Sequence, residues 1–139
     1  MIDQLKSISS IASSGLQAQS TRMRVVSENI ANARSTGATP GAEPYRRKTV
    51  HLAGPEGPGA GPGVNVRTIG LDQATPFTVE HDPGNPAADA EGNVKLPNVN
   101  VLVEMADLRE AGRSYSANLQ MMKQARSMIS MTIDLLRAG

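Results

Sequence analysis

The sequence of 139 residues has no cysteine, no tryptophan, one phenylalanine and two tyrosines. Without cysteine, the chain can form no disulfide, no thiolate metal site and no thiol nucleophile. Because aromatic side chains are scarce, little is available to fill a large globular core. The same scarcity argues against the stacking platforms that bind single-stranded nucleic acids.

An excess of charge of one sign is also lacking, because 14 lysines and arginines stand against 13 aspartates and glutamates. A net charge of +1 gives no global attraction to nucleic acid or to an anionic membrane surface. No apolar run approaches the roughly 18 residues that a membrane helix requires. The first residues do not resemble a secretory signal peptide. We expect no nucleic-acid partner, no direct membrane insertion, and either a cytosolic location or export without a cleaved signal.

Residues that could carry chemistry form no catalytic pattern. His51 and His81 share no motif spacing, and the acidic residues near position 90 lie among turn-forming residues. The glycine-rich run at 54–63 lacks the Gly-Lys-Ser/Thr of a phosphate loop, and its prolines have no N–H to donate. The sequence therefore predicts no enzyme, no cofactor and no metal site.

Helical periodicity is clear in residues 1–33. Apolar side chains recur there three or four residues apart, and only Gln19 interrupts the stripe. Gly15 and paired serines lower helix propensity by up to about 1 kcal/mol each, so this helix needs a partner. Asn29 and Asn32 have side-chain amides that suit the end of a helix. The residues expected at an assembly interface are Ile8, Leu16, Met23, Val26, Asn29, Ile30 and Asn32.

The middle segment, residues 34–98, contains all nine prolines and most of the glycines. The run at 54–63 predicts a flexible loop or a hairpin tip, since proline and glycine suit neither a helix nor a central strand. Short alternating stretches surround it and predict a small β unit of four strands. These stretches lie at residues 45–52, 64–71, 77–81 and 94–96. Four short strands bury little, so the unit is marginal alone.

The last segment, residues 99–139, carries the strongest pattern. Spacings of four and three residues run from Val101 to Leu136, and nine of the eleven positions are apolar, as in a heptad seam. A helix of this length spans roughly 57 Å, which is too long for a chain of this size to bury against itself. Arg126 interrupts the seam, and we interpret it as an inter-subunit ion pair or a snorkelling side chain. The expected interface residues are Val101, Met105, Leu108, Tyr115, Asn118, Leu119, Met122, Arg126, Ile129, Ile133 and Leu136.

Together these segments predict a mainly α fold with a small β insert. The long N-terminal helix (1–33) and the C-terminal heptad helix (99–139) pack as a coiled coil, and the β-rich, Gly/Pro-containing region (34–98) lies between them in sequence. Apolar residues outside each seam indicate that the helices have more than one neighbour. A subunit of an assembly fits this pattern better than a cytosolic coiled-coil adaptor or export chaperone, which would not need the β insert. A cell-wall enzyme is disfavoured because no acid–base pair stands out.

Several motifs resemble a known family. The sequence Ser-Glu-Asn-Ile-Ala-Asn-Ala at 27–33 resembles the motif shared by flagellar rod, hook and hook-associated proteins. Segments 83–89, 92–101 and 113–118 resemble, in the same order, those of rod proteins, as do Pro44, Tyr45, Arg46 and Lys48. The match runs from about residue 16 to the end of the chain.

The resemblance implies a structural subunit of the proximal rod in the bacterial flagellar basal body. Such a subunit polymerises through its terminal helices and transmits torque across the periplasm. Its partners would be further copies of itself, other rod proteins, the rod-building hydrolase or cap, the export apparatus and the membrane ring. The resemblance further implies export through the flagellar type III route without a cleaved signal.

Overall fold

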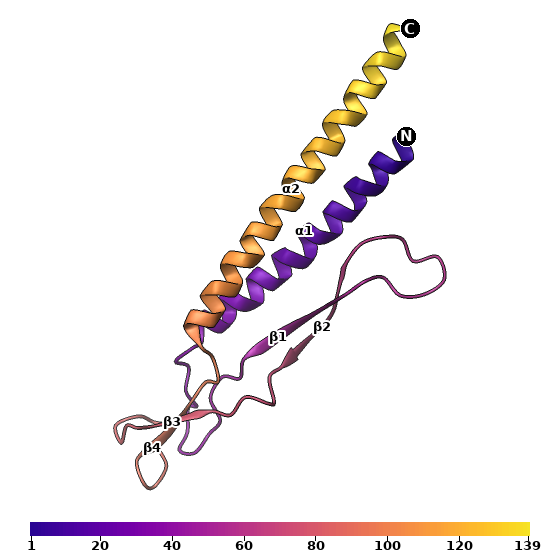
Figure 1. Cartoon of the computed structure of the whole chain (residues 1–139). Helices are drawn as coiled ribbons and strands as arrows, with labels where there is room; N and C mark the ends of the chain where they lie inside the picture. Colours follow the sequence, from indigo (N-terminus) through magenta and orange to yellow (C-terminus); the bar gives the residue numbers. More distant parts are fainter. The chain divides into compact units, whose positions relative to one another are not determined.

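The computed structural model describes residues 1–139, and the chain forms two compact units. Unit 1 comprises Met1–Met23, His51–Thr68 and Arg109–Gly139, and unit 2 comprises Arg24–Val50 and Ile69–Leu108. The elements in order are α1 (Ile2–Ala31), β1 (Lys48–Ala53), β2 (Asn65–Leu71), β3 (Thr78–His81), β4 (Asn93–Leu96) and α2 (Val101–Ala138), labelled in Figure 1. Two long terminal helices with a β insert between them are therefore confirmed. Neither helix combines the length and the apolar character that crossing a membrane requires.

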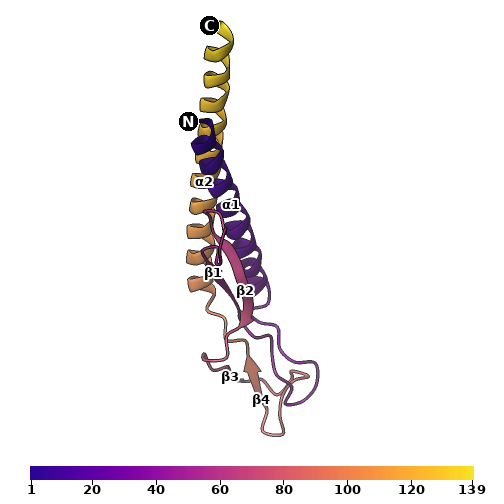
Figure 2. The ribbon, with the colours of Figure 1, turned by 90° about the vertical axis from the view of Figure 1, so that its right-hand side faces the viewer.

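In unit 1, α1 and α2 lie side by side, as Figures 1 and 2 both show. Gly15 of α1 lies against Asn118 of α2, and Arg22 pairs with Glu110 at 3.7 Å between side-chain nitrogen and oxygen. A later residue on α1 thus meets an earlier residue on α2, so the two helices are antiparallel. Small side chains such as Ala12 fill much of this contact, which lets the two backbones approach closely.

The buried side of α2 has a different phase from the predicted seam. In unit 1 Ala111 and Ala125 are buried, and Asn118 contacts Gly15. These three positions are seven residues apart, and each is one residue before a predicted seam position. Arg126 is exposed. The predicted seam positions Tyr115, Met122 and Ile129 are half-buried. Every second position of the predicted seam is therefore at least partly covered within the chain.

A pair of glycine substitutions tests the close approach at Asn118. Gly112 lies on α2 with nothing within 4 Å of an added Cβ, so we expect Gly112→Ala to raise the free energy of unfolding by about 0.5–1 kcal/mol. A Cβ at Gly15 would stand 2.7 Å from Asn118 Nδ2 and 2.9 Å from its Cγ. Asn118 would have to move, so Gly15→Ala should not show this gain. Urea denaturation monitored by circular dichroism measures the free energy of unfolding of both variants.

The control is Gly15→Ala made in an Asn118→Ala background. Removing the amide clears the space that the new methyl group needs, so the gain from helix propensity should return. Equal stabilisation by Gly15→Ala and Gly112→Ala in the otherwise unchanged chain would show that the helices are not in close contact at this point.

The four predicted strands are present, but they form two separate sheets rather than one β unit. β1 pairs with β2, and β3 pairs with β4. The β3–β4 pair is antiparallel, with Thr78 opposite Leu96 and His81 opposite Asn93. Two-stranded sheets bury little apolar surface, which agrees with the mostly exposed strands β2 and β3.

The Gly/Pro run at 54–63 is the loop that connects β1 with β2, as predicted. Gly57 and Gly59 have φ angles of 111° and 84°, which only glycine adopts readily. In unit 1 the end of this loop is held to α1, because the Val64 N–H donates to the Ser14 hydroxyl oxygen at 3.1 Å.

The core of unit 2 is small and partly polar. Val25 and Val94 are fully buried, and so are two polar side chains, Asn29 and Glu104. No aromatic ring belongs to this core, in keeping with the composition. Both units draw residues from all three sequence segments, so the division of the chain at residues 33 and 98 stays a prediction.

Candidate assembly interface and a buried polar junction

Asn29, near the end of α1, is the centre of a polar junction in unit 2 and is only 1% exposed. Its Nδ2 donates to the Lys48 carbonyl oxygen at 2.9 Å, while its Oδ1 accepts from the Lys48 N–H at 2.9 Å. In a β-sheet, the backbone N–H and carbonyl of a neighbouring strand form the same pair of hydrogen bonds with a strand residue. The side-chain amide of Asn29 takes the place of such a strand. The amide therefore pairs with the first residue of β1 and not, as predicted, with the end of its own helix.

Asn32 does serve the end of α1, as predicted. Its Nδ2 donates to the Glu28 carbonyl oxygen at 2.9 Å, and the same oxygen accepts from the Asn32 backbone N–H at 3.0 Å in the last turn of the helix. The Ser35 hydroxyl donates to Asn32 Oδ1 at 3.0 Å and holds the amide in this orientation. The two asparagines of the 27–33 motif thus have different tasks.

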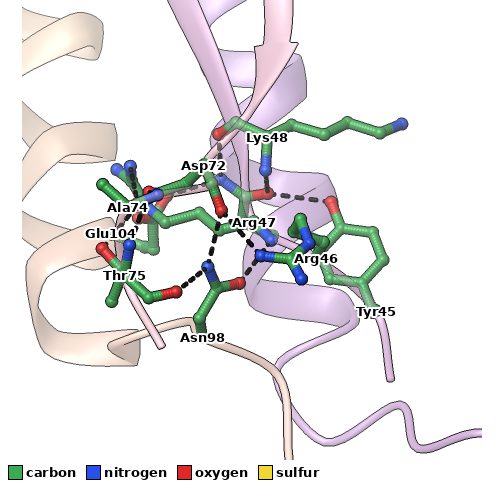
Figure 3. Close-up of polar contacts among 10 residues, drawn as sticks. Tyr45, Arg46, Arg47, Lys48, Asp72, Ala74, Thr75, Asn98 and Glu104 are labelled. Carbon is green, nitrogen blue, oxygen red and sulfur yellow. Dashed lines mark hydrogen bonds and ion pairs between the residues drawn. The ribbon is translucent and has the colours of Figure 1, made fainter. Parts of the chain in front are cut away.

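Glu104 lies in the first turn of α2, and its side chain is 0% exposed. Its Oε1 accepts from Arg47 Nε at 2.5 Å, and its Oε2 accepts from Asn29 Nδ2 at 3.0 Å. A buried carboxylate is costly unless it is paired and hydrogen-bonded, and here both oxygens have donors. Figure 3 shows Glu104 together with Arg47 and the side chains around them. The pair joins the start of α2 to the segment that leads into β1.

Asn98, just before α2, joins two further segments of unit 2. Its Nδ2 donates to the carbonyl oxygens of Asp72 and Thr75, each at 3.0 Å, and its Oδ1 accepts from the Arg47 N–H at 2.7 Å (Figure 3). Asn100 then begins α2, because its Oδ1 accepts from the Leu102 N–H at 3.1 Å. The asparagines of the Pro-Asn-Val-Asn sequence at 97–100 therefore have structural roles.

Charged and phenolic groups at the junction have shifted pKa values. Hydrogen bonds from Lys48 and Arg24 lower the pKa of Glu28, and the Glu28 carboxylate raises the pKa of Lys48. Hydrogen bonds from Thr75 lower the pKa of Asp72. Burial raises the pKa of Tyr45, whose hydroxyl donates to Asn29 Oδ1 at 2.8 Å. At neutral pH the two carboxylates are therefore charged and the phenol keeps the proton that it donates.

The junction joins segments of unit 2 that are far apart in the sequence, and it does not resemble a catalytic site. Asn29, Asn98 and Glu104 are each held by groups of the junction itself. The chain's single buried side-chain polar atom without a hydrogen bond is Gln19 Oε1, in unit 1. No group of three or more histidine, cysteine, aspartate or glutamate residues is placed to hold a metal ion.

The structure divides the predicted interface residues into two sets. Most are buried or half-buried within the chain: Leu16, Met23, Val26, Asn29, Ile30, Asn32, Leu108, Tyr115, Asn118, Leu119, Met122 and Ile129. The others are exposed: Ile8, Val101, Met105, Arg126, Ile133 and Leu136. Arg126 has no ion pair within the chain. The exposed set leaves apolar surface that the chain does not cover by itself.

Further apolar side chains of the two helices are exposed outside the predicted seams. They are Ile11 on α1 and Leu102, Val103, Met121, Met128, Met131 and Leu135 on α2. Extensive exposed apolar surface on a folded protein marks an interaction site. Methionine adapts its shape to different neighbours, so the three methionines suit contacts between subunits.

Sequence reasoning missed Glu104, Arg47 and Asp72 as members of the junction. A usable signal was present on α2, where Glu104, Ala111, Asn118, Ala125 and Thr132 are spaced seven residues apart. A heptad position occupied by small or polar residues allows another helix to approach closely. The fully buried Glu104 lies at this position. No comparable signal exists for Arg47 or Asp72.

Two family models match this chain, one near each end. Residues 10–39 match the family described as "Flagella basal body rod protein", and residues 90–135 match "Flagellar basal body rod FlgEFG protein C-terminal". The first matched region contains Asn29 and Asn32, and the second contains Asn98 and Glu104.

Full-length relatives agree with these matches. The chain is 58% identical over 145 residues to the flagellar basal-body rod protein FlgC of Agrobacterium fabrum, and the alignment covers 99% of each protein. Identity to FlgC of Salmonella typhimurium is 42% over 132 residues, which is 94% of this chain and 97% of the relative. Identity to FlgC of Bacillus subtilis is 39%, over 90% of this chain and 93% of the relative.

Proposed function

Because this chain belongs to the FlgC family of flagellar basal-body rod proteins, we propose that it assembles into the rod through its two terminal helices. It is a structural subunit of the flagellar basal-body rod and not an enzyme. It acts there together with other rod components. The alternative of a cytosolic adaptor or export chaperone has no support, since the relatives that match nearly the whole chain are rod proteins.

The observation that carries the proposal is the apolar surface that both helices leave exposed. Met105 of α2 is 52% exposed, and Val101, Ile133 and Leu136 of the same predicted seam are exposed as well. A helix with apolar residues on several faces is stable when several neighbours surround it. In the rod, α1 and α2 form a coiled coil within each subunit, and the helices of adjacent subunits cover the remaining faces.

This arrangement suits a shaft that transmits torque across the periplasm. Long helices packed along their length resist twisting, and the buried polar junction fixes the chain segments that meet in unit 2. The subunit reaches the periplasmic rod by flagellar type III export without a cleaved signal. Its partners beyond the rod are the export apparatus, the membrane ring and the rod-building hydrolase or cap.

Deletion of the gene, followed by cryo-electron tomography of cell envelopes, tests the proposal. We expect membrane rings without a rod or hook in the deletion strain, and complete basal bodies when the gene is returned. Met105→Asp should fail to restore rods, because it places a charge on apolar surface that assembly buries. The matched control is Gln120→Asp, an exposed change on the same helix that should restore rods.

Each component of the proposal has its own contrary result. Complete rods and swimming cells in the deletion strain would remove the rod function. Missing rods in the deletion strain, together with full rescue by Met105→Asp, would leave a rod subunit that does not assemble through this face of α2.

A further inference from the structure

In unit 1 the Gly/Pro loop and the start of β2 lie beside α1 (Figures 1 and 2). We call residues 54–67 the strap. None of its residues is buried. The hydrogen bond that fixes the strap to α1 runs from the Val64 N–H to the Ser14 hydroxyl oxygen at 3.1 Å. The position of the strap on the helix therefore depends on Ser14.

The contact at Ser14 requires a particular arrangement of both partners. The Ser14 hydroxyl donates to the Ile11 carbonyl oxygen of the same helix at 2.8 Å, so its oxygen is free to accept from the strap. Gly63 passes so close that an added Cβ would stand 2.6 Å from Ser14 Oγ. Its φ of 146° is also one that glycine adopts readily and other residues rarely. We call the contact of Ser14 with Gly63 and Val64 the latch.

On both sides of the latch the strap stands away from α1. A Cβ added at Gly57, Gly59 or Gly61 would meet no atom within 4 Å. An open cavity of about 440 Å³ lies between the strap and the helix near Ser10, and another of about 710 Å³ lies between them near Thr21. Because packing contacts are few on either side, the latch is the main attachment of the strap to α1.

The side of α1 beneath the strap is polar. The α1 side chains that line the two cavities carry hydroxyl or amide groups, with Ala18 as the exception. They are Ser10, Ser14, Gln17, Ser20 and Thr21. Water can satisfy these groups when the strap is absent, and removal of the strap uncovers little apolar surface. The strap therefore covers α1 at a small cost of opening.

The strap is braced by contacts within itself. Arg67 of β2 pairs with Glu56 of the loop at 3.1 Å, and the Ala60 N–H donates to the Gly57 carbonyl oxygen at 3.1 Å. The pairing of β1 with β2 supports its base. None of these contacts involves α1, so they remain when the latch opens. The strap can therefore leave α1 as one piece, without unfolding.

We propose that the strap is a reversible cover of α1 that the latch holds closed. In the closed form the Val64 N–H is bonded to Ser14. In the open form the strap lies away from the helix, and the polar side of α1 between residues 10 and 21 faces water. The two forms present different surfaces of α1 to a partner. The inference concerns a movement within one chain and goes beyond the proposed rod function.

Paramagnetic relaxation in the full-length chain tests whether the latch holds the strap. The chain has no cysteine, so Ala60→Cys gives a single site for a nitroxide label on the strap. We expect the label to broaden the amide signals of α1 around Ser14. Ser14→Ala removes the accepting oxygen, so the ratio of open to closed strap should rise about three- to tenfold and the broadening should fall.

Two controls accompany this measurement. Ser13→Ala changes the neighbouring serine, which is exposed, and should leave the broadening unchanged. A mixture of nitroxide-labelled chains with unlabelled, isotopically enriched chains measures any broadening that arises between molecules.

Glycine substitutions test the latch from the side of the strap. Gly63→Ala places a methyl group against Ser14 and imposes an unfavourable φ, so it should open the strap as Ser14→Ala does. The matched change Gly61→Ala has open space around the new methyl group and should leave the strap closed. In a Ser14→Ala background the latch is already lost, so Gly63→Ala should add little.

Amide hydrogen exchange separates lifting of the strap from unfolding of the hairpin. Ser14→Ala should speed exchange at Val64, while the amides bonded between β1 and β2 keep their protection. Loss of protection along both strands would overturn the inference. So would equal broadening in every variant, or exchange at Val64 that Ser14→Ala does not change. None of these results bears on the rod function, which the deletion strain tests separately.

Discussion

Asn29→Ala should lower the free energy of unfolding of unit 2 by about 3 kcal/mol or more. Four groups lose a bond to this side chain: the N–H and carbonyl oxygen of Lys48, the Tyr45 hydroxyl and the Glu104 carboxylate. A buried polar group left without a partner costs about 1–3 kcal/mol, although such costs do not add fully. The loss should therefore exceed that of an ordinary surface substitution several times.

Tyrosine fluorescence in urea can report this unit separately. The chain has two tyrosines, Tyr45 in unit 2 and Tyr115 in unit 1. With Tyr115→Phe as the background, Tyr45 is the single fluorescent tyrosine, and the midpoint of its transition gives the stability of unit 2. The matched control is Asn32→Ala, which removes one bond to a helix-end carbonyl and should cost about 1 kcal/mol or less.

Asn29→Asp separates hydrogen bonding from the filling of space. Aspartate has nearly the same shape as asparagine and can still accept from the Lys48 N–H. It cannot donate to the Lys48 carbonyl, and it brings a carboxylate to the fully buried Glu104. Like charges in a buried site repel strongly, so this variant should be at least as unstable as Asn29→Ala. If both variants match Asn32→Ala, Asn29 does not hold the junction.

The two long helices were predictable because their signal is local and repeated. Periodicity predicted helices over 1–33 and 99–139, and the observed bounds are Ile2–Ala31 and Val101–Ala138. The phase of the α2 seam was less accessible. Choosing the most apolar positions selected Leu119, whereas the helix contact in unit 1 uses Asn118, because a close approach favours small side chains over large ones. Apolar character alone therefore identified the helix and left open which of its sides faces α1.

The polar junction could not be derived from sequence spacing, because its bonds join residues far apart in the chain. Asn29 and Glu104 are 75 residues apart, and each would be read locally as a helix-end residue. The 27–33 motif includes Asn29, but local reasoning assigned its amide to the wrong backbone group. The same limit applies to the sheets. Short strands can be recognised one by one, but their partners depend on contacts that only the folded chain defines.

Glu104→Leu is expected to cost about 1–3 kcal/mol, because its carboxylate accepts hydrogen bonds from Arg47 and Asn29, and the variant leaves both donors without this acceptor. Arg47 would lose its shortest contact and keep its more distant pairing with Asp72 at 3.7 Å. Asn29 Nδ2 would lose an acceptor as well. The fluorescence of Tyr45 in urea measures this loss. The control is Glu110→Gln in unit 1. The exposed Glu110 carboxylate pairs with Arg22 at 3.7 Å, and its loss should lower the free energy of unfolding by about 0.5 kcal/mol or less.

A double-mutant cycle of Glu104→Leu with Arg47→Leu determines how much of this loss belongs to the pair. If the ion pair is the main contribution, the double variant should be more stable than the sum of the single losses predicts, by about 2 kcal/mol. This would show that the buried charges chiefly specify which segments meet, since apolar side chains can replace the pair at modest cost. Strict additivity would mean that each residue acts through its other contacts, with Glu104 holding Asn29 and Arg47 holding Asn98 and Asp72.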